Sequence, residues 1–216
     1  MFKDMYAVYG AAGFGREVMA LARENLRTNG VATTQLVFVD DNAAVPEING
    51  HRVFRYAEYM AESVERRYVA VAVANSVIRE AIVSRCTSDG ILPWSLAAAN
   101  SVALDDVCVG PGSIICPFVT LTSNIRIGAY FHANLYSYVA HDCVVGDYVT
   151  FAPAVRCNGN IVIEDHAYIG TGAVLKQGQP GRPLTIGRGA VVGMGAVVTK
   201  DVPAGVTVVG NPARVV

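Results

Sequence analysis

The feature that most constrains this chain is an apolar residue that recurs every six positions after about residue 95. The series has no break over twelve positions: Val109, Ile115, Leu121, Ile127, Ala133, Val139, Val145, Phe151, Cys157, Ile163, Ile169 and Leu175. With 52% of the chain hydrophobic, one chosen phase would give this run by chance about once in a few thousand trials. A second series of mostly small or branched residues follows four positions after each start, from Ser113 to Ala173. The hexad is therefore a true repeat.

A fixed period of six predicts a solenoid, and its physical form is a parallel β-helix of triangular section. Three hexads make one coil, with each start residue inside the prism and the small residue near a corner, where the chain turns. The stretch from Lys176 to Thr185 adds five residues to one hexad and contains glycine and proline. We expect a loop there, and about five coils in all.

Residues 1–95 have a different pattern, in which short apolar runs alternate with stretches of helical spacing. The runs at 6–9, 35–41 and 68–73 favour strands, and the stretches at 15–26, 59–67 and 75–86 favour helices, the last opened by Asn75 as a capping residue. Strand and helix in alternation predict a small parallel sheet. We expect a Rossmann-like half-domain over 1–95 and the β-helix over 96–216.

Charge and cysteine content exclude several classes of function. The formal net charge is −1 and no basic stripe is present, which argues against binding to nucleic acid. The apolar runs are far shorter than the ~20 residues that span a membrane, and the first ten residues lack the layout of a signal peptide. The five cysteines include no C-x-x-C pair, so neither a disulfide framework nor a zinc site is indicated. We expect a cytoplasmic protein without a metal.

The run "SYVAHDCVVGDYV" at 137–149 places a histidine and an aspartate inside a valine-rich stretch of the repeat. His141 lies two positions after Val139, so its phase directs it out of the prism. A histidine is the usual general base near neutral pH, and a carboxylate on its other ring nitrogen improves its orientation and basicity. Neighbours in a strand point to opposite faces, so Asp142 can reach His141 only through a bend at a corner.

The tail "GMGAVVTKDVPAGVTVVGNPARVV" resembles the end of hexapeptide-repeat acyltransferases, and the head "VYGAAGFGREV" narrows the resemblance. Together they are similar to the sialic acid O-acetyltransferase and nucleotide-amino-sugar N-acetyltransferase family of bacterial surface-glycan synthesis. The resemblance covers nearly the whole chain. It implies a left-handed helix, a homotrimer with active sites between subunits, acetyl-CoA as co-substrate and a nucleotide-linked amino sugar as acceptor.

The resemblance also implies a set of site residues. His141 is the general base and Asp142 tunes it, while Asn134 contacts the sugar. The glycine loop receives the nucleotide diphosphate, which suits a strand that turns into a helix N-terminus. The substrate-binding residues implied are Ala12, Gly13, Phe14, Asp40 and Asp41, and the coenzyme-binding residues are Gly170, Thr171 and Gly193. The chain departs from the family at Ala74, where glycine is frequent, and at Thr150, where many relatives have histidine.

Several alternatives remain open at this point. The acceptor could be GDP-perosamine or a UDP-linked 4-amino-4,6-dideoxy sugar, and the reaction could be a sialic acid type of O-acetylation. A non-catalytic nucleotide-sugar scaffold is a further possibility, as is an NAD site at Gly10, Gly13 and Gly15. A γ-type carbonic anhydrase also uses this helix with three histidines on zinc. The candidates His132, His141 and His166 stand in different hexad phases, which disfavours a shared metal.

Overall fold

The computed structural model describes residues 4–216, which divide after Leu96 into two compact units. In the first unit, a six-stranded sheet has the strand order β3-β4-β2-β1-β5-β6. Its strands are β1 (Asp4–Tyr9), β2 (Leu36–Val39), β3 (Glu47–Ile48), β4 (His51–Phe54), β5 (Arg66–Val71) and β6 (Leu92–Pro93). The pairing is parallel throughout except for the β3–β4 hairpin.

The helices of this unit are α1 (Gly13–Thr28), α2 (Tyr56–Ala61) and α3 (Ser76–Ser88), with a short 3-10 turn η1 (Thr33–Gln35). Helix α1 buries Val18, Met19, Ala22 and Leu26 on one side, the spacing of an amphipathic helix. Asn75 caps α3 by accepting the backbone N–H of Ile78 at 3.0 Å, as predicted. The prediction of a helix over 59–67 was wrong in its bounds, because α2 ends at Ala61 and residues from Arg66 already pair with β1.

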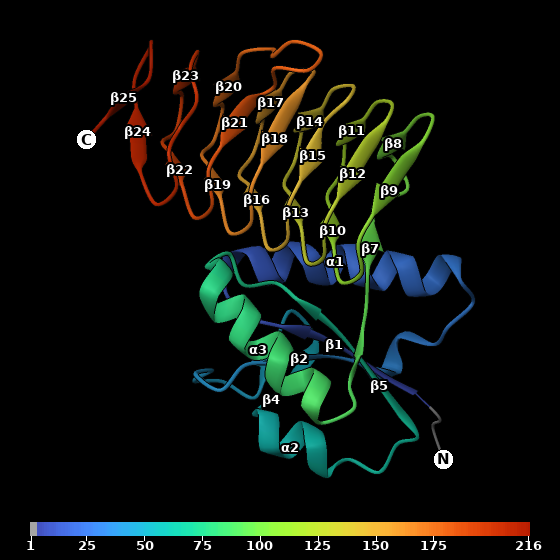
Figure 1. The fold of residues 1–216 in the computed structure, drawn as a ribbon. Helices are drawn as coiled ribbons and strands as arrows, with labels where there is room; N and C mark the ends of the chain where they lie inside the picture. Colours follow the sequence, from blue (N-terminus) through green and yellow to red (C-terminus); the bar gives the residue numbers. More distant parts are fainter. Residues whose placement is uncertain (1–3) are drawn as a thin grey trace. The chain divides into compact units, whose positions relative to one another are not determined.

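The second unit is a parallel β-helix with three faces, seen as stacked coils in Figure 1. One face contains β7 (Leu96–Ala97), β10 (Ile114–Ile115), β13 (His132–Ala133), β16 (Thr150–Phe151), β19 (Tyr168–Ile169), β22 (Val191–Val192), β24 (Thr207–Val209) and the antiparallel β25 (Arg214–Val215). The next contains β8 (Val102–Ala103), β11 (Thr120–Leu121), β14 (Tyr138–Val139), β17 (Arg156–Cys157), β20 (Val174–Leu175) and β23 (Val197–Val198). The third contains β9 (Val107–Val109), β12 (Ile125–Ile127), β15 (Val144–Val145), β18 (Ile161–Ile163) and β21 (Leu184–Ile186).

The hexad predicts the core of this unit almost completely. Every start residue from Ile115 to Leu175 is buried, and so is every member of the second series. Val109 is the exception at 40% exposed, because it belongs to the first coils, which have fewer neighbours within the unit. The predicted loop is present between β20 and β21.

The turns are made one position earlier than the sequence suggested. The residues with left-handed φ precede the small series, at 106, 112, 118, 124, 130, 136, 142 and onward in steps of six. Most of them are not glycine. The assignment of Cys143 as the corner residue was therefore wrong: Asp142 turns the chain with a φ of 58°, and Cys143 is the first buried residue after the turn.

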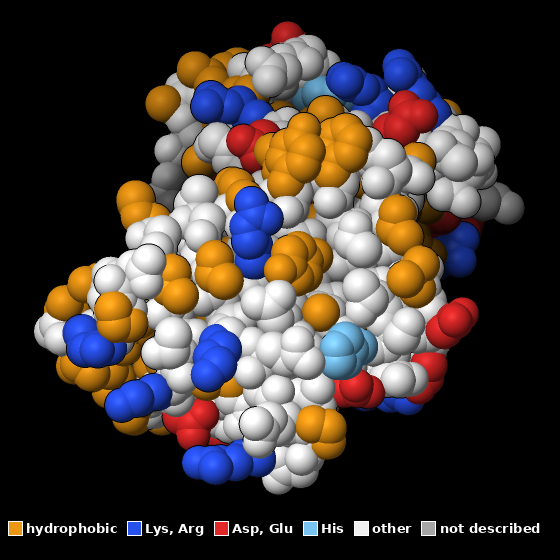
Figure 2. Space-filling model, turned by 90° about the horizontal axis from the view of Figure 1, so that it is seen from above, with side chains coloured by type: hydrophobic (Ala, Val, Ile, Leu, Met, Phe, Trp, Pro, Cys, Tyr) orange, Lys and Arg blue, Asp and Glu red, His pale blue; other side chains and the backbone are white. Residues whose placement is uncertain are grey.

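On the face shown in Figure 2, basic and acidic side chains are interspersed with hydrophobic ones and do not gather into one basic stripe. None of the helices within residues 4–216 combines the length and the apolar character needed to cross a bilayer.

Candidate active site

The corner between the second and third faces of the β-helix brings His141 and Asp142 together. Strand β14 ends at Val139 and β15 begins at Val144, and the left-handed conformation of Asp142 turns the chain between them. This is the bend that the pair requires. Nδ1 of His141 lies 2.7 Å from Oδ2 of Asp142, a short hydrogen-bonding distance.

The pair is accessible to a substrate. The side chains of His141 and Asp142 are 47% and 48% exposed. Asp142 also accepts a bond from Nδ2 of Asn124 at 3.2 Å, from the preceding coil. The hydrogen bond from His141, followed by that from Asn124, holds the pKa of the Asp142 carboxyl below its usual range. Asp142 is therefore ionised at neutral pH, and a proton on Nδ1 leaves the lone pair of the imidazole on Nε2.

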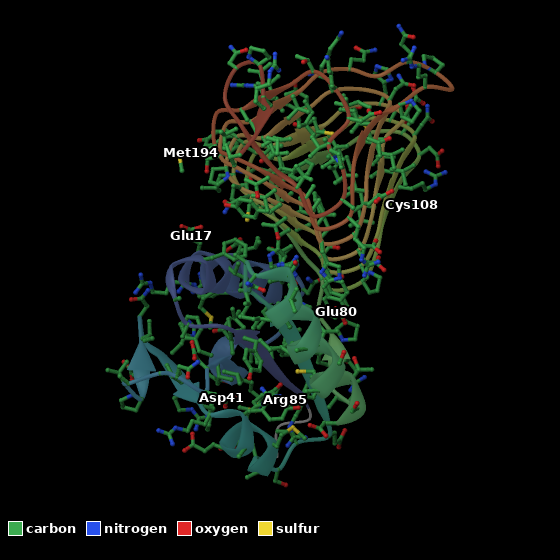
Figure 3. The ribbon with its side chains drawn as sticks, turned by 60° about the vertical axis from the view of Figure 1, so that its left-hand side comes forward. Glu17, Asp41, Glu80, Arg85, Cys108 and Met194 are labelled. Atoms are coloured by element: carbon green, nitrogen blue, oxygen red, sulfur yellow. The ribbon has the colours of Figure 1, made fainter. Side chains whose placement is uncertain are left out.

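A different corner carries Asn134, Gly170 and Gly193. These residues follow β13, β19 and β22, which belong to the first face, so they line up along one edge of the helix. The N–H groups of Gly170 and Gly193 donate to Val192 and Val208 in the next coil. Thr171 is exposed, and Met194 projects away from the coil beside Gly193 (Figure 3).

Asn134 and His141 are not brought into contact within one chain. Strand β14 lies between them, and the carboxamide oxygen of Asn134 accepts the N–H of its neighbour Leu135 at 2.7 Å. The predicted sugar and coenzyme residues thus share one edge of the helix, whereas the predicted base is on another.

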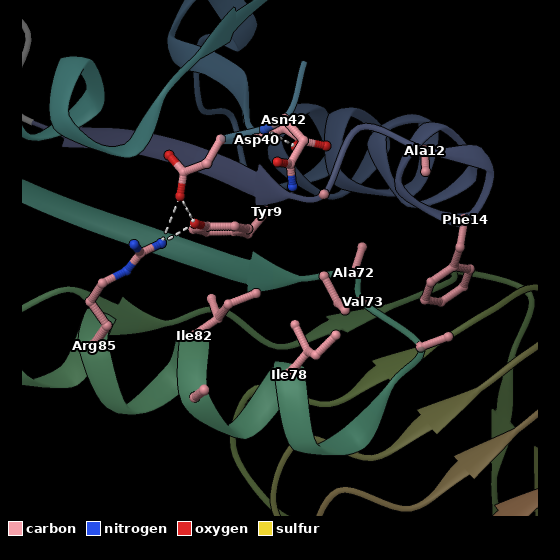
Figure 4. Close-up of a pocket in the computed structure, with 14 residues that line it drawn as sticks. Tyr9, Ala12, Phe14, Asp40, Asn42, Ala72, Val73, Ile78, Ile82 and Arg85 are labelled. Atoms are coloured by element: carbon pink, nitrogen blue, oxygen red, sulfur yellow. Dashed lines mark hydrogen bonds and ion pairs between the residues drawn. The ribbon is translucent and has the colours of Figure 1, made fainter. Parts of the chain in front are cut away.

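The first unit has a cavity of about 700 Å³ at the carboxyl ends of its central strands. It is lined by Tyr9, Gly10, Ala12, Phe14, Asp40, Asp41, Asn42, Ala72, Val73, Ala74, Ile78, Ala81, Ile82 and Arg85 (Figure 4). The edge of a parallel sheet where helices begin is the usual position for a nucleotide. Four of the five residues that we expected to bind the substrate nucleotide line this cavity: Ala12, Phe14, Asp40 and Asp41. The fifth, Gly13, begins helix α1 beside it.

The glycine loop before α1 is tight. A side chain at Gly15 would overlap the carbonyl oxygen of Gly10, so only glycine permits this approach of helix and strand. Asp40 holds the loop, because its carboxylate accepts the N–H of Ala11 at 2.8 Å and that of Asn42 at 2.9 Å. Asp40 is therefore engaged by the protein backbone.

Asp41 belongs to a polar cluster at one end of the cavity. Its carboxylate accepts bonds from the Tyr56 N–H at 2.8 Å, the Tyr9 hydroxyl at 2.9 Å and the Arg85 guanidinium at 3.1 Å. Arg85 also donates to the Tyr9 hydroxyl (Figure 4). Its guanidinium lies 3.9 Å from the centre of the Tyr56 ring. Burial and the bond to Asp41 raise the pKa of Tyr9, which stays protonated.

Sequence reasoning missed Tyr9 and Arg85 as cavity residues. It also missed the apolar face of α3, where Ile78 is 53% exposed although it is a large hydrophobic residue. A signal for this face was available, since Ile78, Ile82 and Arg85 are spaced by four and three residues and share one side of the helix.

The three histidines of the β-helix do not gather at one point. His132 is buried in β13, and His166 stacks on the Tyr148 ring at another corner. Among residues 4–216, no group of three or more histidine, cysteine, aspartate or glutamate side chains could hold a metal ion.

Comparison with known proteins agrees with both units. Residues 6–86 match the model of the PglD N-terminal domain. GDP-perosamine N-acetyltransferase of Escherichia coli O157:H7 is 49% identical over 211 residues, which cover 98% of this chain and 96% of that protein. The chain belongs to this nucleotide-amino-sugar N-acetyltransferase family.

Solved structures extend the agreement to the fold. WeeI from Acinetobacter baumannii AYE is 56% identical, with a TM-score of 0.96 over 99% of this chain and 100% of that one. The acetyltransferase domain of PglB from Neisseria gonorrhoeae FA1090, in complex with acetyl coenzyme A, is 28% identical with a TM-score of 0.84 over the full length of both. The predicted resemblance and fold class, a Rossmann-like half-domain followed by a left-handed β-helix, are confirmed. The predicted enzyme class, an acetyl-CoA-dependent N-acetyltransferase, is that of the family.

Proposed function

We propose that this protein transfers the acetyl group of acetyl-CoA to the 4-amino group of GDP-perosamine, in the cytoplasm and on the route to a bacterial surface glycan. The observation that supports this most is the 49% identity to a GDP-perosamine N-acetyltransferase over nearly the whole of both chains. The accessible pair of His141 and Asp142 supplies the base that such a reaction needs.

In the proposed reaction the amine nitrogen attacks the thioester carbonyl carbon. A C–N bond forms and the C–S bond breaks, so that coenzyme A leaves as the thiol. His141 takes the proton of the amine on Nε2, while Asp142 stabilises the imidazolium that results. The imidazolium then gives this proton to the departing sulfur. No covalent intermediate with the protein is needed, because alignment of the two substrates supplies much of the rate.

We assign the cavity of the first unit to the nucleotide. The diphosphate would lie at the N-terminus of α1 against Ala12, Gly13 and Phe14, where backbone N–H groups favour an anion. Asp40 and Asp41 would contact the base or the ribose of the nucleotide at the end of the cavity where the Asp41 cluster lies. Both carboxylates already accept bonds from the protein, Asp40 from two backbone N–H groups and Asp41 from its cluster, so the contact would use the lone pairs that these bonds leave.

We further propose a homotrimer with each active site between two subunits. Its support is the separation of roles along the β-helix: His141 is on one edge, while Asn134, Gly170, Thr171 and Gly193 are on another. In a trimer, the edge of one subunit that carries His141 would face the edge of the neighbouring subunit that carries Asn134 and Gly170. The pantetheine arm would then lie against the edge of Gly170, and Asn134 would contact the sugar.

The test is release of free thiol from acetyl-CoA in the presence of GDP-perosamine, followed by mass analysis of the product. Cys108 is exposed and would react with a thiol reagent, so the assay uses a Cys108→Ser background. We expect GDP-perosamine to be acetylated faster than UDP- and dTDP-linked 4-amino sugars, and the product to resist mild alkali as an amide does. An alkali-labile ester would indicate O-acetylation, and no thiol release with any acceptor would indicate a scaffold.

A further inference from the structure

The corner that holds His141 is part of a stack of aspartate and asparagine residues. Asp106, Asn124, Asp142 and Asn160 are each eighteen residues apart and have φ angles of 54°, 56°, 58° and 56°. Aspartate and asparagine are the residues other than glycine that most readily adopt this left-handed conformation. We call these four residues the Asx corner. Their side chains stand in register in successive coils.

The carboxylate of Asp142 is held from both sides. Oδ2 faces Nδ1 of His141 at 2.7 Å, and Oδ1 accepts from Nδ2 of Asn124 at 3.2 Å. The backbone N–H of Asp142 also donates to Ser123 at 3.1 Å, which ties the turn to the preceding coil. The orientation of the carboxylate is thus set in part by a side chain of the preceding coil.

The ring of His141 is held by the following coil. A Cβ atom built on Gly159 would lie 2.5 Å from Cε1, 2.6 Å from Nε2 and 2.9 Å from Nδ1 of His141. The imidazole therefore rests on the bare backbone of Gly159. Next to it, the N–H of Asn160 donates to the carbonyl of His141 at 2.9 Å.

We propose that Asn124 and Gly159 are positioning residues for the base: Asn124 fixes the carboxylate that selects the tautomer of His141, and Gly159 provides the surface that directs Nε2. This proposal rests on the proposed function. A misplacement of about 1 Å can cost on the order of 10²-fold in rate, so a change at either residue should lower turnover.

The electrostatic surroundings of the pair are simple. Asn124 contributes an uncharged amide, Asn160 on the other side is also uncharged, and the Cys143 thiol points inward to the Asn158 carbonyl at 3.2 Å. The charges on the same corner are Asp105 and Asp106, two coils before the pair, and Arg126, which bonds to Asp106 and pairs with Val144 from the coil directly before. A new charge at position 124 would therefore act on the pair directly.

The experiment compares Gly159→Ala with Gly146→Ala. The three atoms nearest the new Cβ at 159 all belong to the His141 ring, so the ring must move but the coils need not. At 146 the new Cβ would meet the backbone of Glu164 and Asp165 in the next coil. We expect Gly159→Ala to keep Tm within a few degrees of the wild type and to lose about 30-fold or more in kcat, with both KM values nearly unchanged. Gly146→Ala should instead lower Tm.

The second arm uses Asn124→Asp and Asn124→Leu. The aspartate adds negative charge beside the pair, so the acid limb of the pH–rate profile should move to higher pH by up to about one unit. Asn124→Leu should lower kcat about 10-fold without shifting the acid limb of the pH–rate profile. Asp106→Asn, on the same corner, should leave turnover and profile unchanged.

An NMR measurement of the His141 tautomer in the substrate-free protein separates this proposal from the proposed function. We expect the Nδ1–H form in the wild type and a loss of that preference in Asn124→Leu, whatever the substrate is. Wild-type turnover in Gly159→Ala, or an unchanged tautomer together with an unchanged acid limb in the Asn124 variants, would overturn the proposal. Absence of GDP-perosamine acetylation with the expected tautomer changes would contradict the proposed function alone.

Discussion

Replacement of Asp142 by asparagine tests how the carboxylate supports the base. The amide is nearly the same size, so the corner and its left-handed turn should persist. An amide can present its NH₂ group to Nδ1 of His141, which would place the ring proton on Nε2 and remove the base. Asp142 lies 2.7 Å from Nδ1. In a buried triad the corresponding change costs about 10⁴-fold.

The exposure of the pair reduces this figure. With side chains 47% and 48% exposed, water can solvate either partner and the electrostatic part of the support is weak. General base catalysis as a whole is worth about 10²–10⁴-fold. We therefore expect a loss of kcat of about 10- to 100-fold.

The assay is thiol release at saturating substrates, with KM values for both. Asp106→Asn is the matched control, because Asp106 has the same left-handed conformation on the same corner and is paired with Arg126 instead. The control should retain full activity. A kcat for Asp142→Asn within twofold of the wild type would refute the supporting role described here.

Two further predictions concern stability. Phe151 is fully buried, with its ring 5.1 Å from that of Phe131. Phe151→Ala should therefore lower the free energy of unfolding by about 3–5 kcal/mol in denaturant titrations. The control is Val144→Thr at an exposed position, and a loss below about 1 kcal/mol in Phe151→Ala would contradict the packing. For Asp41, burial alone would raise the pKa, but the Tyr56 N–H and the other bonds outweigh it and lower the pKa. A lowered folded-state pKa stabilises the protein above the unfolded pKa, and this contribution is lost as pH falls through the folded value. The stability difference between wild type and Asp41→Asn should therefore shrink from pH 7 to about pH 3, and a constant difference would contradict the cluster.

The β-helix could be predicted from the sequence because its coils repeat with constant length. Each inward position is found by counting in steps of six, so the burial of Ile115 and Leu175 could be predicted without knowing which distant residues they contact. The position of the turn could not be counted from hydrophobicity alone, because the residues that make it range from aspartate and asparagine to aromatic residues, glycine and alanine. The spacing of Asn124, Asp142 and Asn160 by eighteen does mark that corner, once the coil length is known.

The cavity of the first unit was predicted only in part. The glycine loop is a local pattern, so Ala12, Gly13 and Phe14 were within reach of sequence reasoning. The contact of Arg85 with Asp41 joins residues 44 apart, and no period in the sequence connects them. The same limit applies to Gly159, whose importance depends on a ring from the previous coil.

The central claim is that His141 is the general base for acetylation of a GDP-linked amino sugar. The most direct test is the single-turnover rate of His141→Asn with acetyl-CoA and GDP-perosamine, together with the Kd of each substrate. We expect the rate to fall by a factor on the order of 10² or more while both Kd values change little, because the base acts in the transition state. A rate close to that of the wild type would contradict the claim.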